Sequence, residues 1–231
     1  MSKNCLSAKA QARLRRIKEL NLPEYTTAEE LMNAISHGVG AMLAIAAIVL
    51  LIAFSDLTAK AVTSVTIYSA SLFILYIVST LYHALAPNKA KKVFRILDHC
   101  SIFLLIAGTY TPICLLVLGG ATGWVLFGVV WLAAVVGIIF NSIDIKKFAK
   151  FSMICYIAMG WVVIFAIKPL IDSITAGQLA LLVSGGLAYT AGAGLYGLGK
   201  KHKYVHSVWH VFVLAGSILH FFMVLSCISA R

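Results

Sequence analysis

The stretch VHSVWHVFVLAGSILHFFMVL, residues 205–225, combines a long apolar run with two histidines at its start. A helix rises about 1.5 Å per residue, so about 20 apolar residues cross the hydrocarbon core of a bilayer. His206 and His210 are four residues apart, which places both imidazoles on one face of such a helix. The stretch therefore predicts a transmembrane helix that presents paired histidines near one membrane surface.

The composition of the whole chain agrees with this interpretation. Of its 231 residues, 61% are hydrophobic and only 12% are charged, which leaves too little polar surface to cover a water-soluble domain. The formal net charge of +11 would suit nucleic-acid binding only on the basic face of a folded soluble module. We therefore expect an integral membrane protein with membrane lipid, and not nucleic acid, around it.

Apolar runs of membrane-spanning length recur along the chain. They cover residues 32–54, 62–85, 98–118, 122–141, 150–168, 178–198 and 205–228. The loops between them are too short for a soluble domain. The sequence thus predicts an all-α bundle of seven transmembrane helices over residues 29–231, preceded by a basic segment over residues 1–28.

The basic residues indicate an orientation. If all seven runs cross the membrane, 16 of the 19 Lys and Arg residues fall on the side of the N-terminus. The other side receives only Lys60, Lys168 and Arg231. Because cytosolic loops carry an excess of Lys and Arg, we expect a cytosolic N-terminus and an extracytosolic C-terminus.

Ionisable groups at the cytosolic ends of three runs suggest a metal site. Ser79 and His83 end the second run, Asp98 begins the third, and His206 and His210 begin the seventh. Such groups are costly in a membrane and tend to be functional. Three histidines with an open fourth position are typical of catalytic zinc. We therefore expect the histidines to bind Zn²⁺, Asp98 to hold or deprotonate a zinc-bound water, and Ser79 to orient a ligand, substrate or water.

Plainer interpretations of these residues remain open. Asp98 could simply cap the third helix, because a carboxylate stabilises a helix N-terminus. Ser79 could bond back to its own helix or serve only in packing. His206 alone could be an interfacial histidine beside the lysines that precede it, although its spacing from His210 argues against that.

Three further histidines are set apart from the expected ligands. Glu29, Asn33 and His37 recur every four residues, so they form either a polar group near the metal or an exposed helix start. His99 points about 100° away from its neighbour Asp98 around the helix. His220 lies about 15 Å beyond His210, too far to share a metal, and we expect it to be buried and hydrogen-bonded rather than a proton relay.

Several motifs in order along the chain resemble a known family. They are EELMNAISHGVGA (29–41), STLYH (79–83), RILDHCSIFLLIAGTYTP (95–112) and HSVWHVFVLAGSILHFF (206–222). They resemble the hemolysin III family, the bacterial branch of the progestin and adiponectin receptor superfamily. The resemblance implies a multi-pass protein of the bacterial inner membrane, with His83, His206 and His210 as zinc ligands, Asp98 contacting zinc through water, and Ser79 nearby.

Three functions follow as hypotheses. The superfamily is thought to be related to alkaline ceramidases, which implies a zinc-dependent hydrolase acting on a lipid amide or ester. The family name implies a pore-forming protein with cytolytic activity, although the middle of the predicted membrane domain carries few polar residues to line a pore. A receptor-like protein with structural zinc is the third. The oligomeric state is left open.

Overall fold

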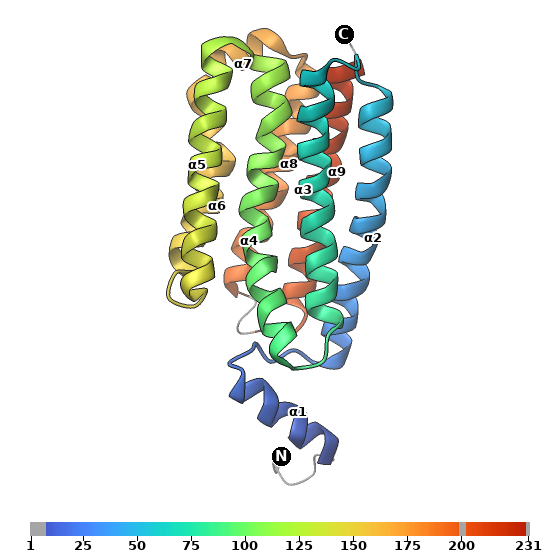
Figure 1. The fold of residues 1–231 in the computed structure, drawn as a ribbon, viewed down its shortest axis with the longest axis vertical. Coiled ribbons are helices and arrows are strands. Elements are labelled where there is room, and N and C mark those ends of the chain that lie inside the picture. Colours follow the sequence, from blue (N-terminus) through green and yellow to red (C-terminus); the bar gives the residue numbers. More distant parts are fainter. Residues whose placement is uncertain (1–7, 199–201, 230–231) are drawn as a thin grey trace.

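Every regular element in the computed structural model is a helix, over the residues 8–198 and 202–229 that it describes (Figure 1). The α-helices are α1 (Ala8–Glu19), α2 (Thr27–Ala53), α3 (Ala59–Ala84), α4 (Lys89–Pro112), α5 (Gly120–Asp144), α6 (Ala149–Trp161), α7 (Ile167–Ser173), α8 (Ala176–Leu198) and α9 (Val205–Ser229). A π-helix, Ile113–Leu118, continues α4, and a 3₁₀ turn, Val162–Ala166, joins α6 to α7.

Seven of these stretches are long and apolar enough to cross a membrane, which confirms the predicted fold class. The third span differs most from its predicted start: it begins at Lys89 rather than at residue 98. The basic residues between the runs predicted over residues 62–85 and 98–118 therefore belong to the first turns of α4; they are Lys89, Lys91, Lys92 and Arg95. Apolar periodicity could not reveal these turns, because their side chains are largely charged.

Local capping signals explain where the helices begin. Thr26 and Glu29 form a reciprocal capping box at the start of α2, at distances of 2.8 and 3.2 Å. The Thr58 hydroxyl accepts from the Ala61 amide at the start of α3. At α4 the Asn88 side chain accepts from the Lys91 amide at 2.8 Å, so this helix starts well before Asp98.

The helix α4 runs through the interior of the bundle, while α5 lies at its margin (Figure 1). In the membrane-spanning windows, 72% of α4 but only 28% of α5 is buried. The helix α1 lies beyond one end of the bundle, and the last turn of α9 lies at the other end (Figure 1). An odd number of spans separates the termini in this way, but which end faces the cytosol stays a prediction.

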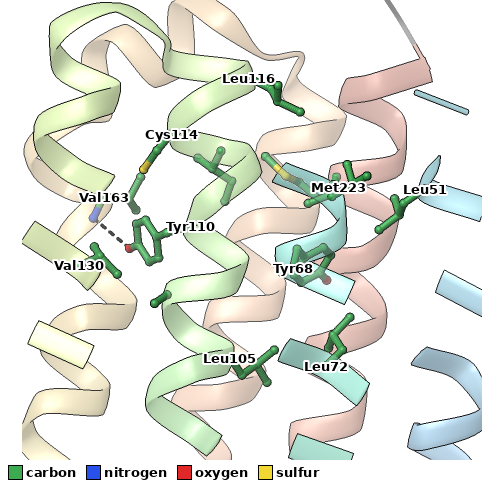
Figure 2. Packing of buried hydrophobic residues seen from close by; sticks show 14 of the residues in the cluster. Leu51, Tyr68, Leu72, Leu105, Tyr110, Cys114, Leu116, Val130, Val163 and Met223 are labelled. Atoms are coloured by element: carbon green, nitrogen blue, oxygen red, sulfur yellow. Dashed lines mark hydrogen bonds between the residues drawn. The ribbon is translucent and has the colours of Figure 1, made fainter. Parts of the chain in front are cut away.

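The core is a continuous apolar cluster around α4 (Figure 2). Tyr110 on α4 donates to the Gly160 carbonyl at 2.9 Å and accepts from the Val163 amide at 3.1 Å, which ties the irregular turn after α6 to the centre of the bundle. Phe103, fully buried, packs so closely on Gly137 that a Cβ there would lie 2.3 Å from its ring. Glycine thus permits α5 to approach α4.

Candidate metal centre

Three histidines meet at the end of the bundle that carries α1. His83 lies on the last turn of α3, and His206 and His210 lie on the first turns of α9. Each is at most 8% exposed, and one ligand atom from each lies within 4.8 Å of the others. The sequence therefore predicted the grouping correctly, and these residues could hold a metal ion.

The ring nitrogens of the three histidines are arranged so that they could bind a metal. Nε2 of His206 and Nε2 of His210 lie 3.2 Å apart. Nε2 of His83 is buried and has no hydrogen-bond partner, although buried polar atoms are nearly always paired. A cation among the three imidazoles would satisfy these nitrogens, and three histidines suit zinc in particular. The identity of the metal stays a prediction.

The Glu30 carboxylate orients the His83 ring by contacting its Nδ1 atom. Its Oε2 lies 2.7 Å from Nδ1 of His83 and its Oε1 lies 2.9 Å from Nζ of Lys91. A carboxylate at Nδ1 keeps the proton on that nitrogen, which leaves the Nε2 lone pair for a metal. Sequence reasoning missed Glu30, because we assigned the neighbouring Glu29 to the polar face of α2.

Lys91 was also missed, since it lies between the runs predicted over residues 62–85 and 98–118. Its side chain is 2% exposed. Besides Glu30, its ammonium group donates to the carbonyls of Tyr82 at 2.7 Å and Leu85 at 3.0 Å. Lys91 therefore satisfies carbonyls at the C-terminus of α3 while it balances the charge of Glu30.

The polar face of α2 faces the histidines, so the exposed-helix alternative is wrong. Asn33 and His37 are buried, and the His37 ring stacks on His210 at 3.6 Å and 13°. The Asn33 amide lies 3.4 Å from Nδ1 of His83. Glu29 instead caps α2 and accepts from the Tyr204 amide at 2.8 Å. The residues of α2 that reach the site are therefore Glu30, Asn33 and His37, at positions i, i+3 and i+7.

Tyr25, just before α2, covers the histidines at this end of the bundle. Its ring stacks on His206 at 5.0 Å and 26° and lies 5.7 Å from the His83 ring. Arg13 of α1 donates to its carbonyl at 3.0 Å. Burial raises the pKa of the Tyr25 hydroxyl well above its usual range, so the phenol stays protonated. No sequence motif pointed to this residue.

Asp98 lines a cavity of about 50 Å³ together with His206 and His210. It lies in the third turn of α4, far from the cap at Asn88, so the capping alternative is wrong. Ser79 is fully buried near the Asp98 carboxyl, but no hydrogen bond of ordinary geometry joins them. The Ser79 hydroxyl makes no bond to its own helix either, which removes the back-bonding alternative.

The two remaining histidines of the spans lie outside the cluster, as expected. His99 lies 3.0 Å from the Arg95 carbonyl through Nδ1 and 3.2 Å from the Tyr196 hydroxyl through Nε2. His220 is buried, with Nε2 at 3.0 Å from the Leu182 carbonyl. Each is therefore hydrogen-bonded to groups other than the three clustered histidines.

A second cavity of about 100 Å³ adjoins the first, farther into the membrane domain. Its walls come from α3, α4, α6, α8 and α9 and are almost entirely apolar. The two cavities share the lining residues Leu75, Ile102, Tyr156, Trp209 and Val213. The space beside Asp98 and His210 thus borders a space suited to hydrocarbon.

Comparison with known proteins identifies the family of the chain. The family model described as Haemolysin-III related matches residues 25–221. The chain is 47% identical to Hemolysin-3 of Bacillus cereus, over 85% of this chain and 90% of that protein. It is 42% identical to a Hemolysin-3 homolog of Bacillus subtilis (strain 168), over 87% and 95%. The human monocyte to macrophage differentiation factor is 26% identical over 86% and 84%. This multi-pass membrane protein belongs to the haemolysin-III-related family.

Proposed function

We propose that the chain is a zinc-dependent hydrolase that cleaves an amide or ester bond of a membrane lipid. The observation that carries the proposal is the meeting of three buried imidazoles, one with an unpartnered Nε2, beside a cavity lined by a carboxylate. Such a donor set and a nearby base are what hydrolysis of a carbonyl compound needs. The adjoining apolar cavity supports a substrate that enters from the bilayer.

His83, His206 and His210 would hold the zinc, with Glu30 keeping His83 in the correct tautomer. When bound, zinc supplies Lewis-acid chemistry: it polarises a carbonyl and makes water nucleophilic near neutral pH. Asp98 would accept the proton of the attacking water at its carboxylate and pass it to the leaving group. Ser79, buried beside Asp98, would orient a ligand, substrate or water there.

The proposal is tested by the Asp98→Asn protein in bilayers of mixed lipid composition. Lipid hydrolysis is measured together with the zinc content of the same samples. We expect zinc content to stay near that of wild type, because the amide is nearly isosteric and the histidines are unchanged. Turnover should fall at least a hundredfold, since an amide cannot accept the proton. Asp172→Asn, an exposed position at the other end of the bundle, is the matched control.

Three results would contradict the proposal. Equal hydrolysis by wild type and Asp98→Asn would remove Asp98 as the base. Hydrolysis by neither, with zinc-independent leakage of a dye from the vesicles, would favour a pore-forming protein, and the Bacillus relatives are named hemolysins. Bound zinc without hydrolysis or leakage would favour a receptor-like protein with structural zinc.

A further inference from the structure

His220 leaves one hydrogen-bonding atom unused deep inside the bundle. The residue is 8% exposed and its ring lines the apolar cavity. Nε2 lies 3.0 Å from the Leu182 carbonyl, which can only accept, so Nε2 carries the proton and donates. A buried imidazole without a counter-charge is neutral, and Nδ1 is then an acceptor. Nδ1 is buried and has no partner.

The surroundings of His220 are built to hold the ring in place. A Cβ at Gly185 on α8 would lie 2.2 Å from Cδ2 of His220, so only glycine leaves room for the ring there. The Tyr189 ring lies 5.4 Å from it on another side. The Tyr189 hydroxyl is itself fixed by Ser217, at 2.7 Å. His220 thus occupies one defined position on the cavity wall.

Two other polar groups of the same wall, Thr109 and Trp161, already have partners. The Thr109 hydroxyl donates to the Leu105 carbonyl at 2.8 Å, and the Trp161 indole donates to the Thr190 hydroxyl at 3.0 Å. Among the cavity-lining residues that the structure describes, Nδ1 of His220 is the buried side-chain atom left without a hydrogen bond. An acceptor of this kind costs free energy until a donor reaches it.

We propose that this cavity binds a lipid chain that carries a hydroxyl group, with Nδ1 of His220 accepting from that hydroxyl. The ligand must supply a donor, which excludes a plain hydrocarbon chain and an ionised carboxylate at this point. This inference rests on the proposed function only where it places the other end of the ligand beside His210. The two histidines are ten positions apart, which separates them by about 15 Å along α9.

This separation sets the position of the hydroxyl. An extended hydrocarbon chain advances about 1.3 Å per carbon, because its bonds of about 1.5 Å are staggered, so about 12 carbons span 15 Å. The chain favoured by the cavity therefore carries its hydroxyl near the middle of a long acyl chain rather than next to the headgroup.

The test measures binding and not turnover. Trp161 and Trp209 line the cavity, whereas Trp124 and Trp131 on α5 do not, so the latter are replaced by Phe. Dibromostearic acid then quenches the remaining fluorescence, and stearic acids with a hydroxyl at successive carbons compete with it. We expect competition to be strongest for a mid-chain hydroxyl, about three- to tenfold better than for plain stearic acid.

Three variants identify the acceptor. His220→Phe should abolish the preference for the hydroxyl, and His220→Gln, which keeps a donor and an acceptor, should retain part of it. Thr109→Val is the matched control on the same wall and should keep the full preference. If His220→Phe does not fold, the positional series on the parent protein still decides the question.

The outcomes separate this inference from the proposed function. Equal competition by all the stearic acids, or no quenching at all, would overturn the hydroxyl site even if the protein hydrolyses lipids. A mid-chain preference that depends on His220, in a protein without hydrolase activity, would support the hydroxyl site and contradict only the hydrolase proposal. A preference that survives in His220→Phe would overturn His220 as its origin.

Discussion

Oε2 of Glu30 lies 2.7 Å from Nδ1 of His83, although the two residues are 53 positions apart in the chain. The contact joins the first turn of α2 to the last turn of α3. It fixes which nitrogen of His83 carries the proton and so which nitrogen remains for a metal. The geometry of the candidate metal centre therefore depends on a residue that is not itself one of the three histidines.

Glu30→Gln should weaken zinc binding by about 10- to 100-fold, because an amide no longer raises the basicity of His83 or holds its tautomer. The measurement is a competition titration of zinc against a chromophoric chelator in detergent. Glu24→Gln, an exposed position in the segment before α2, should leave the affinity unchanged. An unaltered zinc affinity in Glu30→Gln would show that Glu30 serves only to pair with Lys91.

The His206→Ala, His210→Ala double variant should lose stoichiometric zinc, since one imidazole would remain of the three. Elemental analysis of the purified protein measures this directly, with the wild type expected to hold about one zinc per chain. His202→Ala, in the loop before α9, provides the control. Full zinc content in the double variant would place the metal elsewhere.

Gly137→Ala should destabilise the bundle by about 2 kcal/mol, because the new Cβ would overlap the ring of the fully buried Phe103. Gly128 lies on the same helix with nothing within 4 Å of the position of a Cβ. Gly128→Ala should therefore leave stability unchanged or raise it slightly, because alanine has the higher helix propensity. Thermal unfolding of both variants in the same detergent, followed by circular dichroism, compares them. Similar unfolding temperatures would contradict the close packing of α5 on α4.

The N-terminus should face the cytosol and the C-terminus the opposite side. The prediction rests on the basic residues, most of which fall on the N-terminal side. A periplasm-active reporter fused after Arg231 should be active and a cytosol-active one silent. The reverse pattern would mean that the bundle is inverted.

The sequence predicted the helices and the three histidines well, because each depends on a local pattern. Apolar runs mark the spans, and His206 and His210 share a face by spacing alone. The roles of Glu30 and Lys91 were not predicted, because they depend on a contact between helices. An isolated Glu beside another Glu, or a Lys among lysines, carries no sign of the partner that it meets after folding.

The assignment on α2 went wrong for a geometric reason. Glu29 and Glu30 each fit a helical spacing to Asn33 and His37, as i, i+4, i+8 or i, i+3, i+7. The choice between them is made by the capping box, which occupies Glu29 with Thr26 at the helix start. The contact of Tyr25 with His206 could not be predicted, since it joins two residues that are far apart in the sequence.

The ion pair between Glu30 and Lys91 has a consequence for biosynthesis. It links the first and third membrane spans, so both partners precede the last four spans in the order of synthesis. A nascent chain can therefore neutralise both charges early, before either must remain unpaired at the membrane. His206 and His210 belong to the final span, so the three-histidine cluster is complete only at the end of translation. Chains truncated before α9 would have the Glu30–Lys91 pair and His83 but lack the other two histidines of the centre.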